Sequence, residues 1–221
     1  MNYAIIVAGG VGSRMAGSII PKQFIEIADK PVIIHTIEAF INSVSDIKII
    51  VPVPPQWREH WNQVNNNFFS GKNIITAEGG ETRFHSVRNA LNFTTSPSVV
   101  AVHDAVRPFI SKELIKKAME HAGENKTAIP SINVSDSLRK KEKNSSVIVD
   151  RNDYLIIQTP QCFQQEILLM AYEQDYNKKF TDDASVVEAS GIKLSFIEGS
   201  KNNIKITVQE DLKLVECLLR K

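Results

Sequence analysis

The sequence predicts an α/β protein in which a Rossmann-like, doubly wound and mostly parallel sheet forms a single domain over residues 1–221. Three observations lead to this prediction. Short apolar runs alternate with amphipathic stretches, a pattern that packs helices on both faces of a mostly parallel sheet. The chain has 221 residues, of which 43% are hydrophobic and 23% charged, so it can bury a core without disulfides or metals. A glycine-rich turn follows the first apolar run, where an open α/β sheet binds its ligand.

Each expected strand is a short apolar run between turn residues. These runs cover residues 3–8, 47–53, 73–77, 99–103, 127–132, 155–158 and 194–197. The first run follows Met1-Asn2 without a basic stretch and is too short for a signal sequence. We therefore expect no targeting segment at this point.

Helices are predicted between the strands from apolar residues that recur on one face. Pro31 suits a first helical position, and the apolar residues after it share a face at 33, 34, 37, 40 and 41. The same spacing recurs at Trp57, Trp61, Val64 and Phe68. This second stripe predicts core packing rather than stacking on nucleic-acid bases. Ser111 is expected to cap a helix over 112–121 that Gly123 ends, and a last helix is expected over 209–219.

The charge balance and the cysteines limit the class of protein. The chain has 26 Lys+Arg and 25 Asp+Glu, a net charge of +1, which argues against a nucleic-acid binder with many phosphate contacts. No apolar run approaches the roughly 18 residues of a membrane span. Cys162 and Cys217 form no C-x-x-C pattern, so neither a disulfide framework nor a cysteine zinc site is indicated. We expect a cytoplasmic protein whose anion site is local.

Residues 133–151 break the rhythm of strands and helices. The segment is polar and charged at first, and then apolar at Val147-Ile148-Val149. Two interpretations are open: a solvated loop, or a hairpin arm that turns near Asn144-Ser145. An arm that leaves the domain needs another chain to bury it, so the second interpretation predicts an oligomer.

The glycine-rich turn at residues 8–15 fits neither of the two common phosphate-binding motifs. Met15 stands where the dinucleotide motif has its third glycine, and no Gly-Lys-Ser/Thr follows as in a Walker A loop. Arg14 lies within the turn, and Lys22 follows soon after it. Glycine backbone amides and two nearby cations can together bind a triphosphate. The alternative is that Arg14 and Lys22 are ordinary surface charges.

Asp104 and His103 lie at the end of the apolar run 99–103. Parallel sheets present their ligands at the carboxyl edge, and Mg²⁺ is commonly held by one or two carboxylates together with substrate phosphates. Asp104 is therefore a candidate for contact with a metal and a substrate, with helix capping as the alternative. A lone histidine that closes an apolar strand is expected to be packed and hydrogen-bonded rather than catalytic.

Seven motifs run in order along nearly the whole chain. They are Ala8-Gly9-Gly10-x-Gly12-x-Arg14 with Pro21-Lys22-Gln23, Gly79-Gly80-x-x-Arg83-x-x-Ser86-Val87, His103-Asp104-x-x-Arg107-Pro108, Val149-Asp150-Arg151, Thr159-Pro160-Gln161, Thr181-Asp182-Asp183-Ala184-Ser185 and Asn203-Ile204-Lys205. In this order they closely resemble the 2-C-methyl-D-erythritol 4-phosphate cytidylyltransferase (IspD) family. The resemblance implies a fold of the nucleotide-diphospho-sugar transferase type with a protruding β-arm at 133–151. It also implies transfer of CMP from CTP to a polyol phosphate, with release of pyrophosphate, in the non-mevalonate route to isoprenoid precursors.

The resemblance further implies a role for each matching residue. The catalytic residues would be Arg14, Lys22, Arg151 and Lys205. The nucleotide would be bound by Ala8, Gly9, Gly10, Gly12, Gly80, Arg83 and Ser86, with backbone groups of the second glycine turn on the cytosine. The acceptor would be bound by Asp104, Arg107, Ser137, Arg151, Thr159, Thr181 and Lys205. Asp104 would also contact Mg²⁺ or another divalent cation, whereas Asp182 and Asp183 are expected to open a helix.

Two departures from the family pattern occur in the segment 133–151. Ser137 and Arg139 stand where relatives commonly have threonine and lysine, and serine keeps the hydroxyl group. With the family pattern, this arm predicts a homodimer in which Ser137 and Arg151 act at the partner's site.

The residue chemistry agrees with phosphoryl chemistry that needs no general base. A phosphate monoester has a second pKa of about 6 and is largely dianionic at neutral pH. The remaining requirements are in-line positioning and positive charge. A ribitol-5-phosphate cytidylyltransferase is the nearest alternative, and the motifs at 149–151 and 181–185 favour the methylerythritol enzyme. A non-catalytic nucleotide-binding regulatory protein is an alternative of another class, and a dehydrogenase is disfavoured by the broken dinucleotide motif.

Overall fold

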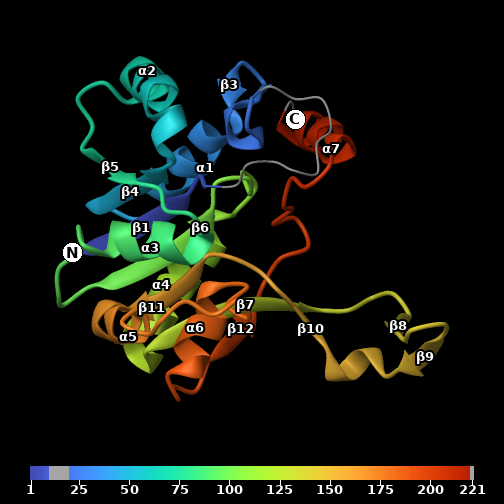
Figure 1. Cartoon of the computed structure of the whole chain (residues 1–221). Helices are drawn as coiled ribbons and strands as arrows, with labels where there is room; N and C mark the ends of the chain where they lie inside the picture. The colour runs from blue at the N-terminus through green and yellow to red at the C-terminus, as the bar shows by residue number, and fades with distance from the viewer. Residues whose placement is uncertain (10–19, 220–221) are drawn as a thin grey trace.

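The computed structural model of the chain describes residues 1–9 and 20–219, and within them one large sheet runs through the molecule (Figure 1). The strand order in this part of the chain is β10-β7-β11-β6-β1-β4-β5, with β12 beside β7. The strands are β1 (Asn2–Val7), β4 (Ile47–Val53), β5 (Ile74–Glu78), β6 (Val99–Asp104), β7 (Thr127–Asn133), β10 (Leu155–Ile157), β11 (Gln161–Gln164) and β12 (Phe196–Glu198).

The strand directions make the sheet mixed. β1 pairs in parallel with β4 and β6, β4 with β5, and β7 with β12. β11 is antiparallel to both β6 and β7, and β10 is antiparallel to β7. The predicted doubly wound α/β fold is therefore confirmed, with two reversed strands. Strand β11 was not predicted, because a run of four residues with a glutamine at each end shows no apolar pattern.

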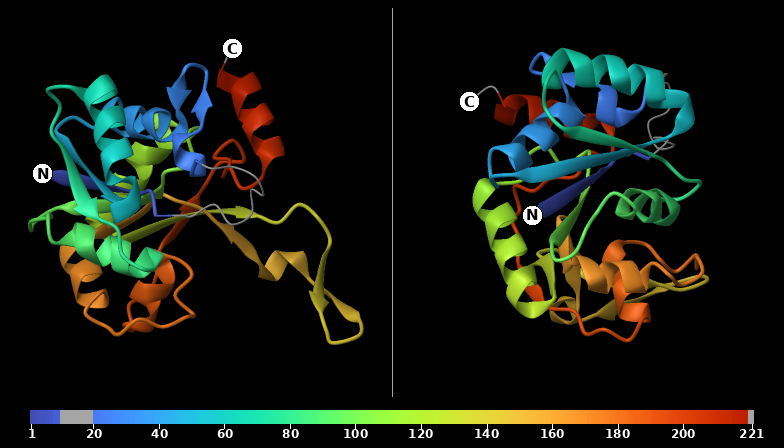
Figure 2. Two further views of the ribbon diagram at one scale, coloured as in Figure 1. Left: turned by 45° about the horizontal axis from the view of Figure 1, so that its top comes forward. Right: turned by 90° about the vertical axis from the view of Figure 1, so that its left-hand side faces the viewer.

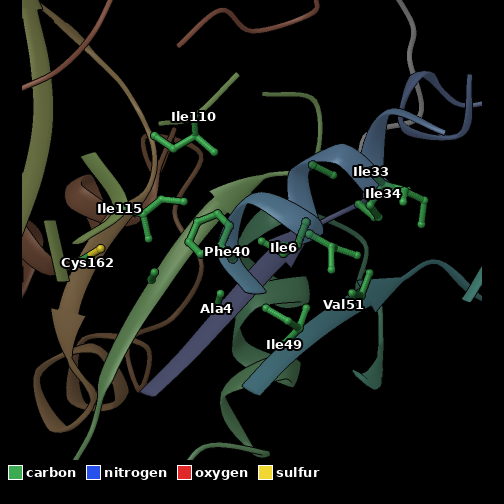
Figure 3. Packing of buried hydrophobic residues seen from close by; sticks show 14 of the residues in the cluster. Ala4, Ile6, Ile33, Ile34, Phe40, Ile49, Val51, Ile110, Ile115 and Cys162 are labelled. Atoms are coloured by element: carbon green, nitrogen blue, oxygen red, sulfur yellow. The ribbon is translucent and has the colours of Figure 1, made fainter. Parts of the chain in front are cut away.

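Helices cover both faces of the sheet (Figure 2). They are α1 (Val32–Ile41), α2 (Arg58–Phe69), α3 (Arg83–Leu91), α4 (Lys112–Asn125), α5 (Gln165–Ala171), α6 (Asp183–Ala189) and α7 (Gln209–Leu219). Buried side chains of α1, α2 and α4 form one core cluster, and those of α3, α5 and α6 form another. Alternate residues of β1 point to opposite faces, so Ala4 and Ile6 join the first cluster, whereas Tyr3 and Ile5 join the second. Figure 3 shows the first cluster, in which Ile6 packs against Ile34 and Val51.

The predicted helices are confirmed except at two ends. Trp61 and Val64 are buried in the first core cluster, as the stripe predicted. The side chain of Ser111 accepts a hydrogen bond from the Leu114 N–H and caps α4. Pro31 precedes the first helical residue instead of occupying it. Gly123 keeps a helical backbone, and α4 ends two residues later because Lys126 takes the left-handed conformation, with φ 72°.

The segment 133–151 forms a projecting hairpin arm (Figures 1 and 2). Strands β8 (Leu138–Lys141) and β9 (Ser146–Val149) pair antiparallel, and the Glu142 N–H donates to the Ser145 carbonyl across the turn. The 3₁₀ turn η3 (Arg151–Asp153) and β10 lead back to the main sheet. The hairpin interpretation is therefore confirmed over the solvated loop.

Helix α7 packs on a small substructure beside the sheet. The short strands β2 (Glu26–Ile27) and β3 (Lys30–Pro31) pair after the 3₁₀ turn η1 (Lys22–Phe24). Ile27, Ile206 and Val215 are buried together in a third small cluster. Another short 3₁₀ turn, η2 (Pro55–Trp57), precedes α2. Among the described residues, no helix is long and apolar enough to cross a membrane.

Candidate active site

Asp104 is the centre of a charged cluster at the carboxyl edge of the sheet. It is the last residue of β6 and lies opposite Val7, the last residue of β1. The Oδ2 atom lies 3.0 Å from Lys205 Nζ and 3.2 Å from Arg107 Nε. The Oδ1 atom lies 3.8 Å from Arg83 Nε. The helix-capping alternative for Asp104 is wrong, because its carboxylate faces three cations and Ser111 caps the helix that follows.

The cations fix the ionisation of Asp104. Burial by itself raises the pKa of this carboxyl group, but Arg83, Lys205 and Arg107 outweigh burial and hold the pKa well below its usual range. Asp104 is therefore a carboxylate at neutral pH. Three cations around this carboxylate give the cluster an excess of positive charge, which attracts anionic ligands.

Hydrogen bonds behind Asp104 connect three segments that are far apart in the sequence. Thr159 Oγ1 accepts from the Asp104 N–H at 3.2 Å and lies 3.0 Å from His103 Nδ1. Arg107 Nη1 donates to the Asn203 carbonyl at 2.7 Å. The side-chain amide of Asn203 donates to the Thr159 carbonyl, also at 2.7 Å. The Thr159 hydroxyl thus lies against β6, and Asn203 fixes the segment that carries Lys205.

His103 is packed and hydrogen-bonded, as predicted. The residue is fully buried, its ring packs edge-on against Phe40, and its Nε2 lies 3.2 Å from the Arg107 carbonyl. Burial lowers the pKa of His103 to about 4, although the nearby Asp104 carboxylate opposes this shift. The imidazole is therefore neutral at pH 7 and holds the backbone of the cluster in place.

The second glycine turn joins the cluster from β5 and α3. The Gly80 N–H donates to Ser86 Oγ at 3.0 Å, and Ser86 Oγ donates to the Thr82 carbonyl at 2.9 Å. A Cβ atom on Gly80 would overlap the Cβ of His85, so this close turn requires glycine. A Cβ atom on Gly9 would lie 3.2 Å from Ser86 Oγ. The two glycine turns of the sequence are therefore adjacent in space.

Lys22 approaches the site from η1. Its Nζ donates to the Thr207 carbonyl at 3.2 Å and approaches the Ile206 carbonyl at 3.5 Å. The side-chain amide of Gln23 donates to the Ala8 carbonyl, which ties η1 to the end of β1. Lys22 and Lys205 are therefore connected through one short backbone segment.

Asp183 is a functional candidate that the sequence reasoning missed. Its Oδ2 lies 2.6 Å from Arg83 Nη2, and its Oδ1 accepts from the Tyr172 hydroxyl at 2.7 Å. Asp183 was expected only to open α6, and Asp182 performs that task in a capping box with Ser185. The sequence did hold one signal, namely a second acid at a helix start that needs only one cap.

The remaining predicted residues divide into two groups. Arg14, Gly10 and Gly12 lie outside the described residues. Ser137, Arg151 and Thr181 are exposed and are not part of the Asp104 cluster. Arg151 donates to the Ser135 carbonyl at the base of the arm, which projects away from the cluster in Figure 1. The described residues hold no group of three or more His, Cys, Asp or Glu residues arranged to bind a metal ion.

Adjacent glycine turns and a cationic cluster at the carboxyl edge of a doubly wound sheet define an α/β nucleotidyltransferase. The family model for 2-C-methyl-D-erythritol 4-phosphate cytidylyltransferase (IspD) matches residues 2–221, and the chain belongs to this family. This result confirms the resemblance found in the sequence motifs.

Curated relatives and solved structures agree with the family assignment. The chain is 46% identical over 217 residues to the 2-C-methyl-D-erythritol 4-phosphate cytidylyltransferase of Bacteroides fragilis, with 98% of each protein covered. It is 45% identical to that of Bacteroides thetaiotaomicron, covering 97% of this chain and 98% of the relative. The crystal structure of the Francisella tularensis enzyme is similar, with a TM-score of 0.79, 30% identity and coverage of 98% and 99% of the two chains.

Proposed function

We propose that this chain transfers CMP from CTP to 2-C-methyl-D-erythritol 4-phosphate, giving CDP-methylerythritol and pyrophosphate in the non-mevalonate pathway. The observation that carries the proposal is the cluster of Arg83, Arg107 and Lys205 around Asp104, in a chain that matches the family over residues 2–221. The cluster gathers positive charge where two anionic substrates must meet.

The acceptor phosphate acts as the nucleophile without a general base. A phosphate monoester is largely dianionic at neutral pH, so no proton has to be removed before attack. His103, the histidine nearest to Asp104 in the sequence, is buried, with its ring nitrogens facing Thr159 and the Arg107 carbonyl. The site must instead reduce repulsion between anions and hold them in line.

Each cation is assigned to one of the two substrates. Arg107 and Lys205 bind the acceptor phosphate, and both are held beside Asp104 in the free protein. Lys22 and Arg14 neutralise the triphosphate and the charge that develops at phosphorus. Asp104 preorganises its cations, because three positive groups without an anion between them would repel one another.

The cytidine end of CTP is assigned to the second glycine turn. Gly80 lets the main chain approach a flat base closely, and Ser86 fixes the turn through its bonds to Gly80 and Thr82. Gly9 lies against Ser86, so Ala8 and Gly9 bound the same space. Arg83 adds a cation between this turn and Asp104.

We further propose that the reaction uses Mg²⁺ or another divalent cation. Magnesium takes one or two carboxylates and fills its other positions with substrate phosphate and water, so the single carboxylate of Asp104 fits an ion held mainly by the triphosphate. Such an ion would supply additional positive charge on the triphosphate. In the protein alone, the Asp104 oxygens face Arg83, Arg107 and Lys205.

The proposed active unit is a homodimer joined through the arm. Ile148 on the arm is 77% exposed, and the adjoining strand β10 exposes Leu155 and Ile156. Apolar side chains gathered on a projecting hairpin are typical of a surface that another chain covers. A closed two-fold dimer would bury both arms in one self-complementary contact and would bring Ser137 and Arg151 to the partner's acceptor site.

Pyrophosphate release from CTP with magnesium tests the proposed reaction. We expect release with 2-C-methyl-D-erythritol 4-phosphate and much slower release with ribitol 5-phosphate. A preference for ribitol 5-phosphate would reassign the acceptor, and no release with either compound would refute the proposed reaction. The cytoplasmic location expected from the sequence stays a prediction.

A further inference from the structure

Arg83 is held between two carboxylates that lie on opposite sides of its guanidinium group. Its Nη2 lies 2.6 Å from Asp183, whereas its Nε lies 3.8 Å from Asp104. The Arg83 side chain is 27% exposed, so part of the guanidinium remains accessible to a ligand. Asp183 is the closer of the two partners and therefore determines where the guanidinium lies.

Asp183 and Tyr172 are both too deeply buried to touch a ligand. Asp183 is 0% exposed and Tyr172 is 2% exposed. Burial and the neighbouring Asp183 charge raise the pKa of Tyr172 well above its usual value, so its hydroxyl keeps its proton and donates to Asp183. One carboxylate oxygen is thus held by the tyrosine, and the other faces Arg83.

Helix capping does not explain the Asp183 side chain. Asp182 accepts from the Ser185 N–H, Ser185 Oγ accepts from the Asp182 N–H, and Gln161 donates to the second Asp182 oxygen. The helix start is therefore complete without Asp183. A buried ion pair seldom stabilises a fold more than well-packed apolar residues of the same size would. The Arg83–Asp183 pair thus requires an explanation other than stability.

We propose that Asp183 and Tyr172 are positioning residues that hold the Arg83 guanidinium toward bound CTP and away from Asp104. This inference rests on the proposed function, in which Arg83 binds the nucleotide. When the Asp183 charge is absent, Asp104 is the remaining carboxylate beside Arg83 among the described residues, and the guanidinium moves toward it. The nucleotide then loses a preorganised cation, whereas the acceptor site keeps Arg107 and Lys205.

Direct titration of the full-length protein with CTP and magnesium, without acceptor, tests this proposal. Asp183→Asn keeps the shape of the side chain and removes its charge, and we expect the Kd for CTP to rise about tenfold. Tyr172→Phe leaves the charge but removes one hydrogen bond, and we expect a rise of about threefold. The KM for the acceptor should change less than the Kd for CTP in both variants.

Ser185→Ala is the matched control, because it breaks the capping box of the same helix without touching Arg83. We expect this variant to have a lower Tm and an unchanged Kd for CTP. In an Arg83→Met background, Asp183→Asn should have no further effect on CTP binding, since both substitutions then act on one interaction.

Three results would overturn the proposal: a folded Asp183→Asn protein with normal CTP affinity, an equal loss in Ser185→Ala, or a full additional loss in the Arg83→Met background. If Asp183→Asn does not fold, an unchanged Kd in Tyr172→Phe would overturn the proposal instead. Wild-type protein without pyrophosphate release would refute the proposed function. Active wild-type protein with an unaffected Asp183→Asn variant would refute only the positioning role.

Discussion

The Asp104 cluster and the projecting arm hold their predicted substrate residues in opposite ways. In the cluster, Arg107 and Lys205 are fixed by contacts to a buried carboxylate within the same chain. On the arm, Ser137 and Arg151 are exposed, and apolar side chains around them face solvent. The cluster is thus preorganised by one chain, whereas the arm has a surface that a second chain would complete. Variants that separate these two conditions test the comparison.

The largest effect is expected at Lys22, on the cluster side of the comparison. Lys22→Ala should lower kcat by about a hundredfold or more, because one preorganised cation for the developing charge is lost. The Tm should change little, since the charge that Lys22 meets is built during the reaction. Steady-state kinetics and thermal melts check both statements.

Lys30→Ala provides the matched control for Lys22. Lys30 is a partly exposed lysine in the same region of the chain, and it pairs with Glu38 outside the site. We expect it to keep wild-type kcat and to lose less than about 1 kcal/mol of stability. Near-normal turnover in Lys22→Ala would remove Lys22 from the mechanism.

Mixing two inactive variants sharpens the comparison further. If Arg151 acts on the partner's site, a dimer of one Arg151→Ala chain and one Lys22→Ala chain has one doubly damaged site and one intact site. Activity should then return to about half of the wild-type value per mixed dimer, as two-fold symmetry requires. Pyrophosphate release is measured after subunit exchange.

Mass analysis of the mixture must show that mixed dimers have formed. Either variant exchanged against itself is the control and should stay inactive. Mixed dimers that remain inactive would place Arg151 in its own chain, and the arm would then need no partner for catalysis.

A smaller effect is expected when the anchor of the cluster loses its charge. Asp104→Asn keeps the shape but no longer offsets its three cations, so kcat/KM should fall about tenfold or more. The variant should also need more magnesium for half-maximal rate. Asp46→Asn is the control, because Asp46 is exposed and its φ of 58° suits asparagine equally well. Full activity of Asp104→Asn at unchanged magnesium would contradict the assigned role.

The smallest effect concerns stability and pH at His103. The unfolded state binds a proton near pH 6.5, whereas burial lowers the pKa of folded His103 to about 4. Between these pH values the unfolded state binds more protons, so stability rises with pH and falls on acidification. The contribution of His103 to this loss is about 3 kcal/mol by pH 4. His103→Asn should show a flatter dependence in denaturant titrations, and an equally steep one would contradict this account.

Sequence periodicity predicted those elements whose apolar residues repeat regularly. The strand over 47–53 and the helix over 209–219 match the structure at both ends. Strand β11 and the end of α4 were not predicted correctly, because pairing between β6 and β7 and the left-handed Lys126 depend on contacts outside the local pattern. The contact of Arg83 with Asp183 joins residues separated by 100 positions and left no local signal.

The site residues were accessible from motifs rather than from periodicity. Asp104, Arg107 and Lys205 come together because β6 ends beside the segment that precedes α7. Sequence spacing could not reveal that Asp104 pairs with several cations at once, since that depends on how three loops meet. The arm showed the reverse: its polar-then-apolar pattern indicated a hairpin, and only the structure distinguished it from a loop.

The backbone segment 203–207 has a consequence for the order in which the site is assembled. It supplies the carbonyl that holds Arg107, the lysine that faces Asp104 and the carbonyls that receive Lys22. A ribosome releases this segment after every strand of the described sheet, and domains begin to fold from their N-terminal side during synthesis. The emerging protein can therefore bury most of its core while its charged centre is still incomplete. The ability to bind two anions arises only when these last residues leave the exit tunnel.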